Sequence, residues 1–169
     1  IPELVLVGTM LIGIIADLFY QREQSFRVGF WVIAGLAIAA LALFLTPAGE
    51  SITLFMGTIV IDPFARMFKF VFLLATTLTI LISLKTDELK SVRTGEYYVL
   101  ITAMTLGMFL MASSVDLIMI YLSIEVVSIV SFILAGYLKT QVRSTEASLK
   151  YVIYGAFSSG IMLYGFSLL

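Results

Sequence analysis

An apolar run from Asp116 to Tyr137 constrains this chain more than any other feature. Its sequence, DLIMIYLSIEVVSIVSFILAGY, is about 22 residues long, enough for a helix to cross the ~30 Å hydrocarbon core of a bilayer. Glu125 lies near the middle of the run. A carboxylate at that depth costs roughly 2.5–3.5 kcal/mol on insertion scales, so a helix that meets only lipid is expected to lack one.

Helical spacing places Glu125 on the same face as Tyr121 and Ser128, at i−4 and i+3. This stripe indicates that Glu125 faces protein or trapped water and not lipid. Two interpretations are open. A structural carboxylate would join two helices through hydrogen bonds. A functional carboxylate would bind and release a proton or pair with a second charge, and this interpretation requires a partner.

The composition indicates an integral membrane protein. Hydrophobic residues make up 61% of the chain and charged residues 12%, against roughly 25% charged residues in soluble domains. The net charge of −1 provides no basic surface for nucleic acid. The chain has no Cys and no His, which excludes Cys-ligated iron–sulfur clusters, His-ligated haem and the usual Cys/His zinc sites from this chain.

Hydropathy predicts an all-α, polytopic transmembrane bundle of about six helices. The predicted spans are 3–20, 28–45, 64–84, 97–113, 116–137 and 145–169. The connection 46–63 is rich in β-branched residues around Gly57 and is too short to span, so it predicts a small hairpin or extended segment at the membrane surface. The first run lacks the basic n-region and cleavage site of a signal peptide. Both ends of the chain have the character of cuts, and we expect a fragment of a longer fold.

Basic residues favour one side of the predicted bundle, which sets the expected orientation. Two of them, Arg66 and Lys69, fall in the first turns of the third span, where snorkelling to the headgroups accounts for both. The connections on the opposite side carry seven: Arg22, Arg27, Lys85, Lys90, Arg93, Lys139 and Arg143. This bias predicts an N-terminus outside the cell and a last span that enters from the cytoplasm. Lys69 remains a minor candidate site, and Asp17 is expected at the membrane interface.

Lys150 is the candidate partner of Glu125. It lies about five residues into the last predicted span, and Tyr154 and Ser158 continue a polar stripe at i+4 and i+8. The predicted spans put Glu125 and Lys150 about 10 Å apart in depth. Two interpretations are open for Lys150 as well: snorkelling to the cytoplasmic face, or membership of a proton relay with Glu125 through water.

Two strings in the second half of the chain resemble a known family. YLSIEVVSIVSFILAGYLK and RSTEASLKYVIYGAFSSGIMLYGFSLL are similar to the antiporter-like membrane subunit N of respiratory complex I, NADH:quinone oxidoreductase, and to its photosynthetic NDH counterpart. The resemblance is strongest over 97–169. Subunits L and M of the same complex and the large subunits of Mrp-type Na⁺(K⁺)/H⁺ antiporters share the fold and the Glu, while the KY-x₃-G-x₃-S-x-I-x-LYG pattern favours subunit N.

The resemblance implies an organisation, a function and a set of partners. Residues 1–96 would form the first three helices with the insert at 46–63, and 97–169 the first three helices of an inverted-repeat proton-channel unit. Glu125 and Lys150 would take part in proton translocation. This chain would hold no cofactor, and NAD, FMN, iron–sulfur clusters and quinone would belong to partner subunits. The expected location is a bacterial plasma membrane, with a thylakoid membrane as the alternative.

Overall fold

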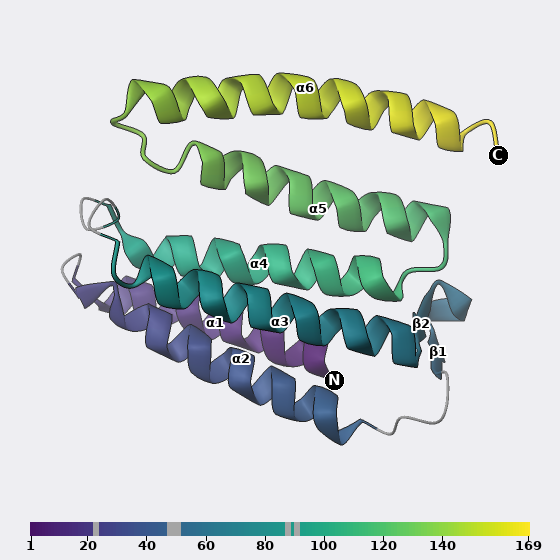
Figure 1. The fold of residues 1–169 in the computed structure, drawn as a ribbon, viewed down its shortest axis with the longest axis horizontal. Coiled ribbons are helices and arrows are strands. Elements are labelled where there is room, and N and C mark those ends of the chain that lie inside the picture. The colour runs from purple at the N-terminus through teal and green to yellow at the C-terminus, as the bar shows by residue number, and fades with distance from the viewer. Residues whose placement is uncertain (22–23, 47–51, 87–88, 90–91) are drawn as a thin grey trace.

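The computed structural model describes residues 1–21, 24–46, 52–86, 89 and 92–169. Long helices that run side by side make up most of these residues (Figure 1). Their bounds are α1 (Pro2–Phe19), α2 (Arg27–Leu45), α3 (Pro63–Ser83), α4 (Thr94–Ser113), α5 (Leu117–Ala135) and α6 (Val142–Phe166). The predicted all-α bundle of six helices is confirmed.

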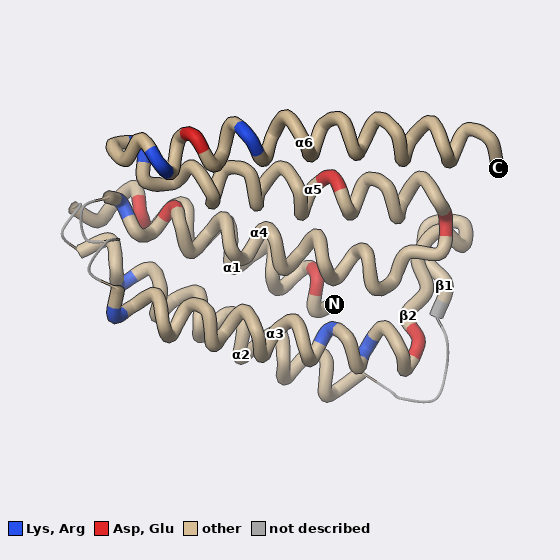
Figure 2. Tube along the Cα trace, turned by 45° about the horizontal axis from the view of Figure 1, so that its top comes forward, with Lys and Arg blue, Asp and Glu red and all other residues tan. Residues whose placement is uncertain are grey.

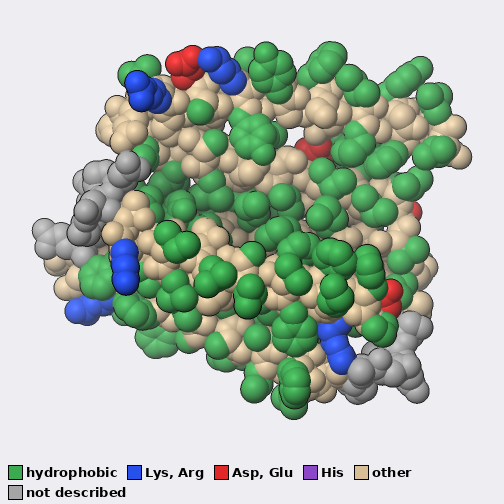
Figure 3. All heavy atoms as spheres, viewed as in Figure 1, with side chains coloured by type: hydrophobic (Ala, Val, Ile, Leu, Met, Phe, Trp, Pro, Cys, Tyr) green, Lys and Arg blue, Asp and Glu red, His purple; other side chains and the backbone are tan. Residues whose placement is uncertain are grey.

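Five of the helices in the described part of the chain, α1 to α5, are long and apolar enough to cross a membrane. Apolar side chains also cover most of the face shown in Figure 3. α6 is not among the five, although its 25 residues are the longest stretch of helix. It begins at Val142, three residues before the predicted start, and so includes Arg143 as well as Glu146 and Lys150.

Helix boundaries follow local sequence signals. Pro2 and Pro63 lie in the first turns of α1 and α3, where a missing N–H costs little. Asp62 caps α3, because its Oδ1 accepts a hydrogen bond of 2.7 Å from the backbone N–H of Ala65. Only residues 114–116 separate α4 from α5, so these two helices form the tight antiparallel hairpin that the sequence predicts.

The predicted hairpin is present within the described part of the 46–63 connection, while 47–51 lies outside the described residues. Strands β1 (Ile52–Leu54) and β2 (Ile59–Ile61) pair antiparallel. The turn between them holds Phe55 and Met56 at positive φ, 51° and 56°, and both side chains are exposed. A backbone hydrogen bond of 3.0 Å from Val115 to the carbonyl of Thr58 attaches the hairpin to the α4–α5 connection.

Helix α4 is the centre of the packing, since it lies against α1, α2, α3 and α5, whereas α6 packs on α5. The buried core contains Leu6, Val28, Val32, Leu36, Leu43, Ile80, Tyr98 and Phe109. Small residues allow the closest approaches. A Cβ on Gly35 would lie 2.2 Å from Oγ1 of Thr9, and one on Gly155 would lie 2.2 Å from the ring of Phe132. These glycines let α1 meet α2 and let α5 meet α6 at short range.

Hydroxyl side chains within the helices bond to their own backbone. Each donates to the carbonyl four residues earlier, the geometry that satisfies Ser and Thr inside a helix. The set comprises Thr9, Thr77, Thr79, Ser83, Thr102, Thr105, Ser114 and Ser123. Some hydroxyls also bond between helices: Thr76 on α3 and Thr105 on α4 are 2.8 Å apart, and Ser83–Tyr97 and Ser114–Ser123 are each 3.4 Å apart.

Candidate functional site

Glu125 lies at the centre of α5, eight residues after Leu117 and ten before Ala135. Its side chain is half-buried. One carboxylate oxygen, Oε1, is fully buried and has no hydrogen-bond partner among the described residues. Because a buried polar atom normally has a partner, this oxygen is an exception among the described side chains.

Lys150 lies on α6 and is directed away from the described bundle. Its side chain is 65% exposed, and Nζ is 2.5 Å from Oε1 of Glu146, one turn earlier. The hydroxyl of Ser148 donates to the carbonyl of Phe132 over 2.9 Å, which fixes the register of α6 on α5. Relative to this contact between Ser148 and Phe132, Glu125 lies seven residues deeper along α5 and Lys150 lies two residues deeper along α6. The difference of five residues corresponds to about 8 Å along the axis, close to the depth expected from sequence.

The polar stripe predicted below Lys150 does not face α5. Tyr154 is 74% exposed and Ser158 is also exposed. Ser148 and Gly155 form the face of α6 that meets α5. The described structure therefore places Glu125 and the stripe of Lys150 on different helices without joining them, and whether they act together stays a prediction.

Lys69 does not snorkel. Its side chain is only 1% exposed, and Nζ lies 2.6 Å from Oε1 of Glu3 at the start of α1. The ammonium is also 5.7 Å from the centre of the Phe109 ring. The snorkelling interpretation of Lys69 is therefore wrong, because the lysine has a carboxylate partner inside the protein and does not need the headgroups. Arg66 also has a partner in the protein, since its guanidinium donates a hydrogen bond of 2.5 Å to the carbonyl of Thr46 at the end of α2.

Asp17 lies near the end of α1, the level predicted for it, but it is buried there instead of exposed at the interface, since only 4% of it is exposed. Ser25, fully buried, donates a hydrogen bond of 2.5 Å to Oδ1 of Asp17 and accepts one of 2.7 Å from the backbone N–H of Gly95. A Cβ on Gly95 would lie 2.0 Å from the Asp17 oxygen, so a glycine is needed for this approach. The carboxylate thus joins α1, the start of α2 and the start of α4.

Arg93 connects the same cluster to the C-terminal end of α5. Its guanidinium lies 3.7 Å from the Asp17 carboxylate and donates to the backbone carbonyls of Asp17 and Tyr20, at the end of α1. A cation at this position complements the negative end of the helix. The hydroxyl of Tyr137, just after α5, donates to the carbonyl of Arg93.

The Tyr137 link makes a specific pH dependence testable. Burial, followed by the charges of Glu96 and Asp17, raises the pKa of Tyr137 to about 12. Because the pKa of Tyr137 is higher in the folded than in the unfolded state, its protonated hydroxyl contributes to stability at pH values below the unfolded pKa of about 10. This contribution is lost as pH rises from about 10 to about 12. We expect Tyr137→Phe to show a shallower loss of thermal stability over that window than the parent protein. Equal pH profiles for the two would contradict the link.

Sequence reasoning overlooked the partners in both charged clusters. Lys69 and Glu3 fall at the same end of the predicted bundle, so the rule that intramembrane charges pair could have joined them. Arg93 and Asp17 also lie at span ends on the same side of the membrane. Nothing in the sequence, however, identifies Ser25 and Gly95 as the contacts of Asp17. Among the described residues no group of three or more Asp, Glu, His or Cys side chains is arranged to hold a metal ion.

Comparison with known proteins identifies the family resemblance. The family described as NADH:quinone oxidoreductase/Mrp antiporter, TM, matches residues 114–169, which include Glu125 and Lys150. NADH-quinone oxidoreductase subunit N 2 of Chloroherpeton thalassium is 47% identical across all of the chain, and subunit N of Chlorobium chlorochromatii is 43% identical across all of it. The chain resembles subunit N of NADH-quinone oxidoreductase. NAD(P)H-quinone oxidoreductase subunit 2 of Gloeobacter violaceus is 38% identical over 99% of the chain.

The fold supports the same resemblance. A chain in the structure of respiratory complex I from Thermus thermophilus with bound aureothin matches 99% of this chain with a TM-score of 0.80 and 25% identity. The present chain spans 34%, 33% and 33% of the three relatives named above and 36% of the Thermus chain. The subunit N-like sequence is thus about one third of the length of its relatives.

Proposed function

We propose that this chain is part of a membrane subunit that translocates protons in an NADH:quinone oxidoreductase of the complex I type. The subunit would do no redox chemistry, and quinone reduction in partner subunits would drive it. Support comes from relatives named as subunit N along the whole chain and from the fold shared with a complex I chain. Membrane subunits of the same complex would be its partners.

The observation that carries this proposal is the buried, unpartnered oxygen of Glu125 within the described residues. Removing a carboxylate from water disfavours its charged form, and a nearby cation restores it. A change of charge in a neighbouring part of the complex would switch Glu125 between holding and releasing a proton, which is the elementary step of a pump.

Lys150 would be the next proton-accepting group. Its exposed position on the described helices leaves it accessible to the remaining two thirds of a full-length subunit. Since Nζ now binds Glu146, the lysine would have to leave this pair to exchange a proton with a relay.

Replacing Lys150 tests this role directly. We expect Lys150→Ala to lower proton translocation about tenfold or more while the complex still assembles, because a positioned proton-transfer group contributes roughly 10²–10⁴-fold. Lys150→Arg should be milder, since it keeps the charge. The measurement is proton uptake per quinone reduced in proteoliposomes. Equal losses in both variants would assign geometry, and not proton transfer, to Lys150.

The proposed membrane orientation has the N-terminus outside, in a bacterial plasma membrane or, as the alternative, a thylakoid membrane. Figure 2 shows Lys and Arg gathered at the end of the bundle that carries the α1–α2, α3–α4 and α5–α6 connections. Five described residues support it: Arg27, Lys85, Arg93, Lys139 and Arg143. Arg22 and Lys90, also counted in the sequence argument, lie outside the described residues. An excess of Lys and Arg marks the cytoplasmic side.

A Na⁺(K⁺)/H⁺ antiporter subunit is the second candidate, because the description of the matched family includes Mrp antiporters. Relatives named as subunit N favour the oxidoreductase. Purifying the full-length protein from its membrane separates the two. We expect quinone-reductase subunits to copurify and proton uptake to require quinone reduction. Sodium- or potassium-driven proton exchange without those subunits would support the antiporter instead.

A further inference from the structure

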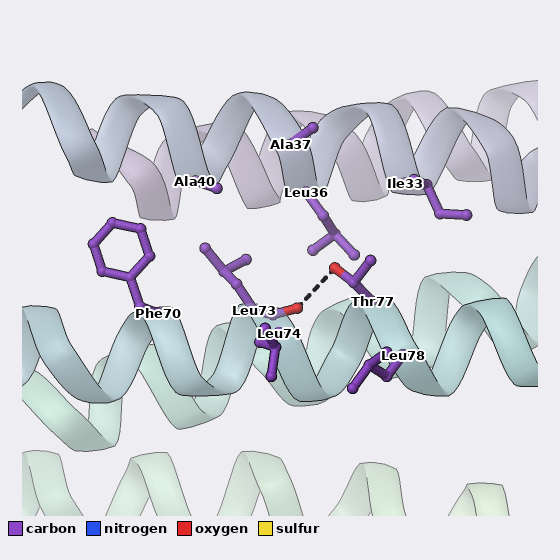
Figure 4. Close-up of a pocket in the computed structure, with 9 residues that line it drawn as sticks. All are labelled: Ile33, Leu36, Ala37, Ala40, Phe70, Leu73, Leu74, Thr77 and Leu78. Atoms are coloured by element: carbon purple, nitrogen blue, oxygen red, sulfur yellow. Dashed lines mark hydrogen bonds between the residues drawn. The ribbon is translucent and has the colours of Figure 1, made fainter.

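A cavity of 260 Å³ lies between α1 and α4, beside the Asp17 cluster. Its walls change character along the helices. Asp17, Arg93 and Glu96 line one end, where Leu18 also lies, while the aliphatic residues Ile14, Val99 and Leu100 line the deeper part. By contrast, the groove between α2 and α3 in Figure 4, of about 310 Å³, has Thr77 as its single polar side chain, and the hydroxyl of Thr77 is bonded to Leu73.

The charged end of the α1–α4 cavity lies at the level expected for lipid headgroups. Asp17 is two residues from the end of α1, and Arg93 immediately precedes α4. Nearby, the indole N–H of Trp31 donates to the hydroxyl of Tyr20 over 3.4 Å. Tyr and Trp collect at the membrane–water interface, so this pair marks the same level. Val99 and Leu100 lie one to two turns deeper along α4. The cavity is thus polar at the interface and apolar toward the membrane centre.

The polar end has two carboxylates and one guanidinium, and because Asp17 pairs with Arg93, Glu96 carries the uncompensated charge among the described residues. Arg93 is 38% exposed, and its guanidinium has donors beyond those used on Asp17 and Tyr20, so it can receive a phosphate. Glu96 is exposed on the first turn of α4, three residues further along, and can receive an ammonium group. A primary ammonium donates hydrogen bonds to a carboxylate, whereas a quaternary one has no N–H to donate.

We propose that this cavity binds a zwitterionic phospholipid whose head carries a primary ammonium, of the phosphatidylethanolamine class. The phosphate lies against Arg93 and the start of α4, the ammonium lies against Glu96, and one acyl chain follows Ile14 and Leu100 into the bilayer. Glu96, the charge left when Asp17 and Arg93 pair, selects the ammonium, and the further guanidinium N–H groups of Arg93 donate to the phosphate. An anionic lipid would meet Glu96 without a cation, and a choline lipid could not donate to its carboxylate.

Native mass spectrometry of the full-length protein in its native assembly tests the site. After delipidation, the protein receives an equimolar mixture of dioleoyl phosphatidylethanolamine, phosphatidylcholine and phosphatidylglycerol. We expect the ethanolamine lipid to be retained over the choline lipid roughly fivefold, the order that one charge-assisted hydrogen bond supplies. Glu96→Gln should remove this preference. Leu100→Trp, which fills the apolar end, should reduce retention of the lipid itself.

Asp116→Asn is the matched control, since it removes one negative charge at the opposite end of α4, roughly 30 Å away for a helix of this length. It should leave the preference intact. Three results would overturn the proposal. The first is a preference that survives both Glu96→Gln and Leu100→Trp. The second is a loss of preference in the Asp116→Asn control. The third is retention of phosphatidylglycerol equal to that of the ethanolamine lipid, which would assign the cavity to anion binding alone.

Discussion

Glu125→Gln is expected to reduce proton translocation about tenfold or more while quinone reductase subunits still assemble. Gln keeps the shape of the side chain and fills the same space, but it cannot bind and release a proton. A group that transfers protons in the rate-limiting step contributes roughly 10²–10⁴-fold, so the loss should be large. Proton uptake and quinone reduction, measured together in proteoliposomes, would show the effect as a lower ratio of protons to electrons.

Two variants on the same helix control this experiment. Asp116→Asn removes a negative charge at the start of α5, and because Asp116 makes no side-chain cap hydrogen bond there, pumping should be unchanged. Glu125→Asp keeps an ionisable group about one methylene shorter and should retain part of the activity. Full pumping by Glu125→Gln would remove this carboxylate from the mechanism and leave it a structural group.

Lys69→Met is expected to destabilise the protein by about 3 kcal/mol. Breaking a buried ion pair typically costs 3–5 kcal/mol because the remaining charge loses its partner. The lower end applies here, since Lys69 is 1% exposed but Glu3 is 23% exposed and keeps some contact with its surroundings. Unfolding of the purified protein by heat or by a denaturing detergent would measure the change. Lys139→Met, at an exposed lysine, should shift stability by no more than about 0.5 kcal/mol.

A double variant separates the ion pair from simple packing. Glu3→Gln combined with Lys69→Met removes both charges, so the penalty of an unpaired carboxylate disappears. Replacing both partners of a buried pair is often nearly neutral, and we expect the double variant to recover most of the lost stability. If Glu3→Gln adds its own loss to that of Lys69→Met, the two side chains contribute independently and the pair is not the source of stability.

Helix positions could be predicted well because the bilayer sets them. A membrane span needs about 20 apolar residues, so the ends of α2, α3 and α4 fall within about three residues of their predicted bounds. α6 was harder to bound. The hydropathy of its charged first turns is typical of a loop. In the structure Ser144 and Ser148 hydrogen-bond to α5, and the helix begins at Val142. The division into 1–96 and 97–169 stays a prediction.

The environment of each charge could not be predicted from the sequence, because it depends on which helices become neighbours. Asp17 and Lys69 each lie near a helix end, where exposure to headgroups is the simplest expectation. Both are buried, since residues from distant segments, Ser25 and Gly95 for Asp17 and Glu3 for Lys69, lie beside them. Glu125 could be singled out from the sequence because a central carboxylate is costly in lipid wherever its helix packs, and its role in proton transfer stays a prediction.

Ser and Thr side chains that bond within their own helix affect how such a protein assembles. Each helix enters the bilayer with these hydroxyls already satisfied, so insertion does not depend on finding a neighbour. The hydroxyls that make no second bond to a neighbouring helix contribute little to helix association, which then depends on close steric fit at sites such as Gly35 against Thr9. A chain built this way can lose hydroxyls during evolution at small cost, whereas enlarging a contact glycine would push two spans apart.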